Sequence, residues 1–357
     1  MMWLLLSLGA CVGGYEIEPR PESCAVQTLP SYAPDALSGI EINPSTYTVP
    51  WADERTVQMH MWYPTAATSG ESARYLDMFV DDKSLVGAPY AEPLEGCRHP
   101  LLVYSHGSQA WAGSSSTVVR QFVNAGWVVI APDHTDNTLT QNVADKPRSF
   151  SLTRVEDVRH AIDWAESLPI DHALAGRIDT SRVLVMGHSF GAQTSWLLSG
   201  PTFDTEAIAA GCAQEPQCTD EAIAAFAESP GDARVVGVVP AAGSANTSLV
   251  ADEGWSTIAA PVLYMTGTAD QDGTEAFERA SEGDVTWIEI EGGCHESFTD
   301  TAVSCPDVDK ALGVEITARY ATAFGTRTVL SSDDADVASV LDGTTVISDL
   351  VTLQTSR

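Results

Sequence analysis

Residues 182–198 read RVLVMGHSFGAQTSWLL, and this stretch decides the fold class of the chain. Residues 182–186 are mostly apolar and β-branched, which predicts a buried strand, and residues 190–198 are predicted as a helix. Between them lies Gly187-His188-Ser189-Phe190-Gly191, a G-x-S-x-G pentapeptide at a strand-to-helix turn. Its glycines permit the strained elbow that presents a serine Oγ above a sheet. The stretch therefore predicts that Ser189 is a nucleophile.

Short apolar segments alternate with helical patterns along most of the remaining chain. Predicted strands cover residues 46–49, 56–63, 101–105, 127–131, 182–186, 235–239, 261–266 and 285–290, and predicted helices cover 114–125, 152–168, 190–198 and 308–324. Buried strands separated by helices indicate an α/β fold, in which helices cover both faces of a mostly parallel sheet. An alanine- and acid-rich segment after the elbow helix interrupts the pattern and predicts a small insertion.

These patterns divide the chain into consecutive segments. We expect a signal peptide over residues 1–10, a linker over 11–45, a single domain over 46–324 with its insertion over 200–232, and a C-terminal tail over 325–357. Residues 64–99 are expected to be irregular and rich in loops. The tail is rich in Ser, Thr and Asp, and its sequence does not place it in the fold.

The chain is strongly acidic. Its 357 residues include 49 Asp and Glu against 18 Lys and Arg, a formal net charge of −31, and 44% of the residues are hydrophobic. The apolar fraction suffices for a buried core and excludes disorder as the main state. The negative charge repels phosphate backbones, so no nucleic acid partner is expected.

The N-terminal residues predict export. Residues 2–12, MWLLLSLGACV, form an apolar run too short to span a bilayer, and Leu8-Gly9-Ala10-Cys11 places small residues before a cysteine. This segment resembles a bacterial lipoprotein signal, in which the cysteine becomes the lipidated first residue, although the first basic residue is Arg20. The alternatives are an ordinary secretory peptide and an unprocessed buried segment. We expect a cell-envelope lipoprotein anchored through Cys11, or otherwise a periplasmic or secreted protein.

The six remaining cysteines agree with export. An even number of cysteines in an exported chain is typical of disulfides, and the absence of a CxxC pair gives no support to a zinc or redox site. Several pairings are formally possible; proximity favours Cys212–Cys218 and Cys294–Cys305, which leaves Cys24–Cys97. A Cys294–Cys305 bridge would close a short loop and steady the adjacent His295.

A serine nucleophile needs a histidine base and an orienting acid, and in this architecture both follow the serine along the chain. The predicted strand 261–266 is followed by Gly267-Thr268-Ala269-Asp270, and strand 285–290 by Glu291-Gly292-Gly293-Cys294-His295. We therefore expect Asp270 as the acid, with Asp272 as its competitor, and His295 as the base. The other histidines lack this context, and His106 and His134 are expected to make structural hydrogen bonds.

The negative charge that develops on a substrate carbonyl needs hydrogen-bond donors. One expected donor is the backbone N–H of Phe190, directly after the nucleophile. The other is that of Ser108, in the loop His106-Gly107-Ser108-Gln109 after an earlier strand, with Gln109 as the alternative. No metal and no organic cofactor is implied. The phosphate-loop patterns GxxxxGK[ST] and GxGxxG are absent, which gives no support to nucleotide binding.

Five short motifs occur in a characteristic order. They are YSHGS (104–108), APDH (131–134), GHSFGA (187–192), GTAD (267–270) and GCHESFTD (293–300). In this order the chain resembles the α/β-hydrolase superfamily, and more narrowly the bacterial esterases related to platelet-activating-factor acetylhydrolases and dienelactone hydrolases. The resemblance covers about residues 46–324. It implies an α/β-hydrolase fold and a serine esterase that works through a Ser189-Asp270-His295 triad and an acyl-enzyme.

Two departures from these families bear on the substrate. Mammalian acetylhydrolases place the acid after the strand that follows the elbow helix, but residues 240–246 (PAAGSAN) contain no carboxylate. Dienelactone hydrolases use a cysteine nucleophile, whereas this elbow carries Ser189. Simple esters, phospholipids and polyesters therefore remain alternative substrates, and a peptidase or thioesterase would share the same residues. The alternative of another class is a non-catalytic surface binding protein on a hydrolase scaffold.

Overall fold

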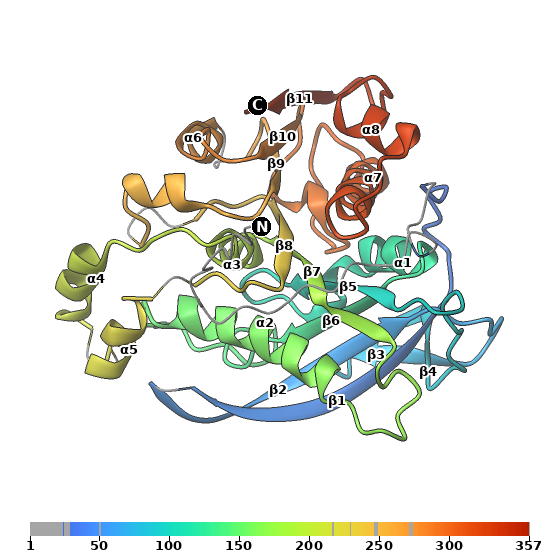
Figure 1. The fold of residues 1–357 in the computed structure, drawn as a ribbon, viewed down its shortest axis with the longest axis horizontal. Helices are drawn as coiled ribbons and strands as arrows, with labels where there is room; N and C mark the ends of the chain where they lie inside the picture. Colours follow the sequence, from blue (N-terminus) through green and yellow to red (C-terminus); the bar gives the residue numbers. More distant parts are fainter. Residues whose placement is uncertain are drawn as a thin grey trace, which may run out of the picture.

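The computed structural model describes Cys24 and residues 29–49, 51–215, 218–228, 230–245, 249–270 and 274–356. This part of the chain forms an 11-stranded sheet (Figure 1). From one edge to the other its strands are β11 (Val351–Thr355), β10 (Val285–Ile290), β9 (Val262–Gly267), β8 (Val235–Ala241), β7 (Ile178–His188), β5 (His99–Ser105), β6 (Val128–Asp133), β2 (Ala52–Tyr63), β1 (Ser38–Val49), β4 (Phe79–Val86) and β3 (Glu71–Tyr75).

The central strands are parallel. Strands β10, β9, β8, β7, β5 and β6 pair in parallel with one another. At the flanks, β11 pairs antiparallel with β10, β2 with β6 and β1, and β3 with β4, whereas β1 and β4 are parallel. Every residue of β5 and β6 is buried, because helices cover both faces of a parallel sheet. The α/β class and the mostly parallel sheet predicted from the sequence are confirmed.

Two hydrophobic cores lie on the two faces of the sheet. Helices α1 (Ser116–Asn124), α7 (Lys310–Thr328) and α8 (Ala335–Leu341) cover one face, and α2 (Phe150–Glu166), α3 (Phe190–Leu198) and α6 (Thr274–Arg279) cover the other (Figure 1). Strand β7 contributes to both cores, because successive side chains of a strand point to opposite faces. Val183 and Val185 pack in the core with α2, whereas Leu184 and Met186 pack in the core with α7.

Two short helices follow α3, in the segment predicted as an insertion. They are α4 (Thr205–Cys212) and α5 (Asp220–Ala225), and they are joined by the disulfide Cys212–Cys218. The side chains of Asp204 and Thr219 accept hydrogen bonds from the first turns of these helices, as N-cap residues do. Helix α4 adds the buried side chains of Ile208 and Cys212 to the core that contains α2 and α3, and the partly buried Ile223 and Ala225 of α5 pack against it.

The structure differs from the sequence predictions at both flanks of the sheet. Residues 64–99, expected to be loop-rich, contain β3 and β4, and β1 begins at Ser38 within the expected linker. The C-terminal residues form α8 and then β11, whose Leu353 pairs with Ile288 of β10. These flanking strands are partly exposed and carry many polar side chains, so they lack the apolar run by which the central strands were predicted.

Three disulfides connect the cysteines in the predicted pairs, Cys24–Cys97, Cys212–Cys218 and Cys294–Cys305. Disulfides are typical of proteins in oxidising compartments, which here indicates an extracellular or periplasmic protein. Within the described residues, no helix is long and apolar enough to cross a membrane. The predicted signal segment 1–10 and Cys11 lie outside the described residues.

Candidate active site

Ser189 lies in a strained elbow between β7 and α3. Its φ of 56° and ψ of −117° are unusual for a residue with a side chain, and its N–H donates to the carbonyl of Ala241 at 3.0 Å. The flanking glycines are required by close backbone contacts: a Cβ on Gly187 would lie 2.1 Å from Gly191 O, and one on Gly191 would lie 1.8 Å from Ser105 O. The G-x-S-x-G pattern thus reflects tight packing around the serine.

The structure brings Ser189, His295 and Asp270 together from the carboxyl ends of β7, β10 and β9. His295 Nε2 lies 2.9 Å from Ser189 Oγ, and His295 Nδ1 lies 3.1 and 3.2 Å from the two carboxylate oxygens of Asp270. A carboxylate only accepts hydrogen bonds, so Nδ1 carries the proton and Nε2 is free to accept the serine hydroxyl. Asp272, the competing acid, lies outside the described residues.

The acid and base loops are joined by backbone hydrogen bonds. Ala269 N–H, next to Asp270, donates to Gly293 O at 2.9 Å, and Gly292 N–H donates to Thr268 Oγ1 at 2.8 Å. A Cβ on Gly267 would lie 2.1 Å from Gly293 O, so the backbones of the two loops are in direct contact. The separation of acid and base is therefore fixed by the loops themselves.

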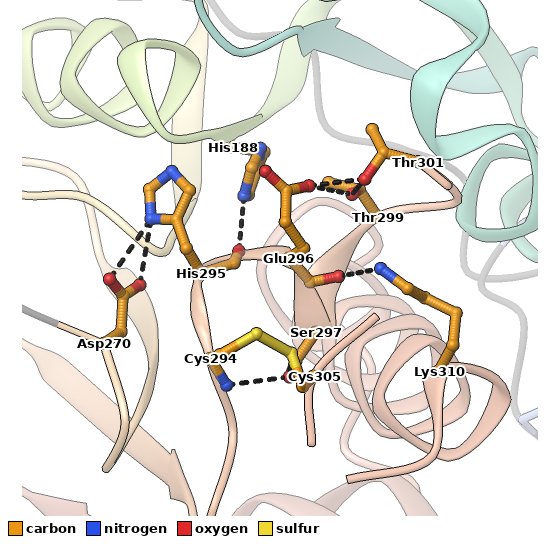
Figure 2. The surroundings of a disulfide bond; sticks show 10 residues. All are labelled: His188, Asp270, Cys294, His295, Glu296, Ser297, Thr299, Thr301, Cys305 and Lys310. Atoms are coloured by element: carbon orange, nitrogen blue, oxygen red, sulfur yellow. Dashed lines mark hydrogen bonds and ion pairs between the residues drawn. A yellow bond between two sulfur atoms is a disulfide. The ribbon is translucent and has the colours of Figure 1, made fainter. Parts of the chain in front are cut away.

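A disulfide and a serine hold the base loop on its other side (Figure 2). Cys294, directly before His295, is bonded to Cys305. Ser297 Oγ accepts the N–H of Cys294 at 3.0 Å and lies 3.0 Å from Cys305 Sγ. The backbone of Ser297 packs against α7, where a Cβ on Gly313 would lie 2.4 Å from Ser297 O.

His188, beside the nucleophile, contacts the backbone of the base His295 with its side chain. Its Nε2–H donates to the carbonyl of His295 at 2.8 Å, as Figure 2 shows. Burial, together with the nearby His295 ring, lowers the pKa of His188 to about 4. A neutral imidazole with one N–H fits this role at pH 7, so His188 acts as a fixed donor that orients the base loop.

Glu296 offers a second carboxylate close to the base. Its carboxylate accepts hydrogen bonds from the hydroxyls of Thr299, at 3.1 Å, and Thr301 (Figure 2). Its backbone carbonyl accepts a hydrogen bond from Lys310 Nζ. Because this carboxylate is engaged by threonines while Asp270 reaches the imidazole, the geometry favours Asp270 as the orienting acid.

Two backbone N–H groups flank the nucleophile. Within the described part of the chain, neither Ser108 N–H nor Phe190 N–H has a hydrogen-bond acceptor. The alternative donor, Gln109 N–H, is engaged by Asn137 O at 3.1 Å. A Cβ on Gly107 would lie 3.2 Å from the Cβ of Ser189, so this loop reaches the nucleophile. The arrangement favours Ser108 over Gln109 as an oxyanion donor.

A buried polar cluster lies behind the oxyanion loop, and the sequence analysis did not predict it. Asp157 accepts hydrogen bonds from Arg55 Nε at 2.7 Å and from His134 Nδ1 at 2.7 Å. His106 Nε2 accepts the N–H of His134 at 3.0 Å, so both histidines make structural bonds. Arg154 completes the cluster. A signal was present, because Arg154 and Asp157 lie on the buried side of α2 among apolar residues.

A hollow of about 400 Å³ lies between β2 and the N-terminal end of α2. Trp51, Arg55, Lys146 and Phe150 are among the residues that line it. The ring centroid of Phe150 lies 6.0 Å from that of Phe190, which follows the nucleophile. The hollow is therefore separated from the elbow by one aromatic contact.

One group of side chains in the described residues has the composition of a metal site. Cys212, Glu215 and Cys218 bring three candidate ligand atoms within 4.8 Å of one another. Both cysteine sulfurs are joined in a disulfide, whereas metal binding requires thiolates. This donor set therefore fits a structural cross-link rather than a metal ion.

The sheet order and the elbow are those of the α/β-hydrolase fold, which is the fold that the resemblance drawn from the sequence implied. The structure is similar to that of a ferulic acid esterase from Streptomyces cinnamoneus, with a TM-score of 0.60 over 89% of this chain and 96% of that chain, at 18% identity. In sequence the chain is 26% identical over 147 residues to the platelet-activating factor acetylhydrolase of Cavia porcellus. This match covers 30% of this chain and 34% of that protein. The chain thus matches about a third of the relative's length. No family model matches the sequence.

Proposed function

We propose that this chain is an exported serine hydrolase that cleaves carboxylic esters. The observation that carries the proposal is the continuous line of hydrogen bonds from Asp270 through His295 to Ser189, at 3.1 and 2.9 Å. A serine hydroxyl in this position is activated by the imidazole that takes its proton, and the carboxylate holds that imidazole in the required tautomer.

In the first half-reaction Ser189 Oγ attacks the ester carbonyl carbon while His295 Nε2 accepts the hydroxyl proton. The electron pair of the carbonyl moves to its oxygen, and Asp270 stabilises the imidazolium through Nδ1–H. Collapse of this tetrahedral intermediate breaks the bond to the alcohol oxygen, which takes the proton from the imidazolium. The alcohol leaves, and the acyl group remains on Ser189.

In the second half-reaction a water molecule attacks the acyl carbon while His295 takes one of its protons. The new tetrahedral intermediate collapses, the carboxylic acid leaves, and the proton returns to Ser189 Oγ. The N–H groups of Ser108 and Phe190 donate to the oxyanion in both steps. Each such donor contributes roughly 10²–10³-fold to kcat in enzymes of this kind.

We propose esters with a short acyl or an aromatic group as the substrates. Phe190, directly after the nucleophile, and Phe150, whose ring centroid lies 6.0 Å from that of Phe190, support an apolar group of modest size. The two similar proteins are named for ferulic acid esterase and platelet-activating factor acetylhydrolase activities. Phospholipid and polyester substrates are the alternatives. Trp196 of the elbow helix α3 is fully buried in the core, so it is not available to contact a substrate.

Export is part of the proposal. It is supported by the three disulfides and by the signal-like sequence of residues 2–12. We propose anchoring to a cell envelope through a lipid on Cys11. Mass spectrometry of the mature N-terminus from the native host would test this: a diacylated Cys11 supports the anchor, and an unmodified N-terminus at another residue contradicts it.

A fluorophosphonate probe tests the catalytic assignment. We expect the wild type and a Ser199→Ala variant, changed at the end of the elbow helix, to be labelled, and Ser189→Ala to be unlabelled. A panel of nitrophenyl esters of rising acyl length, a feruloyl ester, a phospholipid and a polyester film would then identify the substrate class. A well-folded wild type that is neither labelled nor active on any ester would favour the non-catalytic binding protein.

A further inference from the structure

The guanidinium of Arg154 is buried behind the loop that carries Ser108. Its residue is 0% exposed, and its nitrogens donate to Asn137 Oδ1 at 2.7 Å, to Ser105 Oγ at 3.1 Å and to the carbonyl of His106. Every one of these acceptors is neutral. A buried positive charge is costly without a bonded carboxylate, so an apolar side chain of similar size would fill this space at lower cost. The charge therefore indicates a role beyond packing.

The first role concerns the loop on one side of the proposed oxyanion hole. Asn137, held by Arg154, donates from Nδ2 to Ser108 Oγ at 3.0 Å and accepts the N–H of Gln109 at 3.1 Å. Within the same loop, His106 Nδ1–H donates to Gly107 O at 2.7 Å. That carbonyl belongs to the peptide unit whose other end is Ser108 N–H, so the direction of this N–H is fixed from behind.

The second role concerns the other side of the hole. The guanidinium carbon of Arg154 lies 4.6 Å from the ring centroid of Phe190, within the range of a cation–π contact. Its Nε donates to Thr194 Oγ1 at 3.3 Å, and Thr194 Oγ1 donates to Phe190 O at 3.0 Å. A single guanidinium thus contacts Phe190 directly and holds Ser108 through Asn137, although Ser108 follows β5 and Phe190 begins α3.

The charge of Arg154 also favours an anion in front of the cluster. Arg55 bonds Asp157 and lies 4.0 Å from a carboxylate oxygen of Asp136, and burial lowers the pKa of His134 to about 3 and that of His106 well below its usual value. Both histidines are therefore neutral, and in the described residues the hydrogen bonds of Arg154 all go to neutral groups. Such a fixed charge in a dry interior stabilises negative charge that develops nearby.

We propose that Arg154 is a positioning residue that holds the Ser108 loop and Phe190 so that their two N–H groups converge on the oxyanion. This inference rests on the proposed esterase function, because it assigns a role in the same reaction. It predicts that loss of the guanidinium weakens binding of the transition state and leaves binding of the ground-state substrate almost unchanged.

The test compares Arg154→Met with Arg159→Met, which removes another arginine of α2. Arg159 bonds Glu156 and the carbonyls of Pro230 and Gly231, none of which belongs to the Ser108 loop or the elbow. On a nitrophenyl ester we expect Arg154→Met to lower kcat by about 10²–10³-fold, with KM within about threefold of the wild-type value. A trifluoromethyl ketone inhibitor forms a tetrahedral adduct with the serine, and its affinity should fall by a similar factor. Arg159→Met should change neither quantity by more than about threefold.

A second variant keeps the proposal testable if Arg154→Met does not fold. Ser108→Ala removes the exposed hydroxyl that Asn137 holds, and we expect a three- to tenfold loss of kcat and of ketone affinity at unchanged KM. A folded Arg154→Met with wild-type kcat and ketone affinity, or a loss confined to KM, would overturn the inference, as would an unaffected Ser108→Ala. Because the wild type is measured in the same series, an inactive wild type would instead refute the proposed function.

Discussion

Removal of the Cys294–Cys305 disulfide should lower the stability of the protein clearly and its catalytic rate only slightly. The perturbation is the double variant Cys294→Ala/Cys305→Ala. The bridge closes a loop with a sequence separation of 11, and the chain-entropy relation then gives a loss of about 2.8 kcal/mol in the free energy of unfolding at 25 °C. An unfolding entropy of about 2.1 cal/mol/K per residue, summed over 357 residues, converts this loss into a fall in Tm of about 4 °C.

Catalysis should change much less. A base displaced by about 1 Å can cost about a hundredfold in rate, but His295 retains other anchors when the bridge is removed. Its carbonyl still accepts the hydrogen bond of His188 at 2.8 Å, and Gly293 O still accepts Ala269 N–H at 2.9 Å. Ser297 Oγ still accepts Cys294 N–H at 3.0 Å. We therefore expect kcat at 25 °C to fall by less than about tenfold.

The assay is urea unfolding followed by circular dichroism, with ester hydrolysis at 25 °C on the same preparations. The matched control is Cys212→Ala/Cys218→Ala, whose bridge has a sequence separation of 6 and contributes about 2.2 kcal/mol by the same relation. The control should keep full activity, because its helices lie outside the acid and base loops. A base-loop variant that loses more than a hundredfold in kcat while folded would refute the reasoning, as would a stability loss below about 1 kcal/mol.

Three further predictions concern the triad and the buried histidines. Ser189→Ala and His295→Ala should each lower kcat by about 10⁴–10⁶-fold with little further loss in the double variant, and additive losses in steady-state kinetics would contradict the assignment. Asp270→Asn should lower kcat by up to about 10⁴-fold with an unchanged circular dichroism spectrum, and near-normal turnover would identify another carboxylate as the acid. Burial lowers the pKa of His188 to about 4 and that of His134 to about 3, so below pH 6.5 the unfolded chain binds protons that the folded chain does not. Stability should therefore fall as pH decreases, by about 2 kcal/mol for each histidine between pH 7 and pH 5, and urea unfolding at both pH values would reveal a flat profile if this is wrong.

The sequence by itself determined the features that depend on short segments. The apolar strand, the two glycines and the helical pattern around Ser189 are all local, so they predicted the elbow without knowledge of the fold. Asp270 and His295 could be chosen because each follows a predicted strand, and parallel strands bring their carboxyl ends to one edge of a sheet. The pairing of Cys212 with Cys218 and of Cys294 with Cys305 followed from closeness along the chain.

The tertiary structure alone decided the features that depend on residues far apart. Strand β11 has no distinctive pattern, and it is a strand because β10 offers an unpaired edge. The cluster around Arg154 joins residues from several elements, and only the folded chain removes water from them and fixes which donor meets which acceptor. A sequence shows that Arg154 and Asp157 interrupt an apolar helix face, but it does not show the partners that make their burial possible. Asn137 is 17 positions from Arg154, and Arg55 is 102 positions from Asp157.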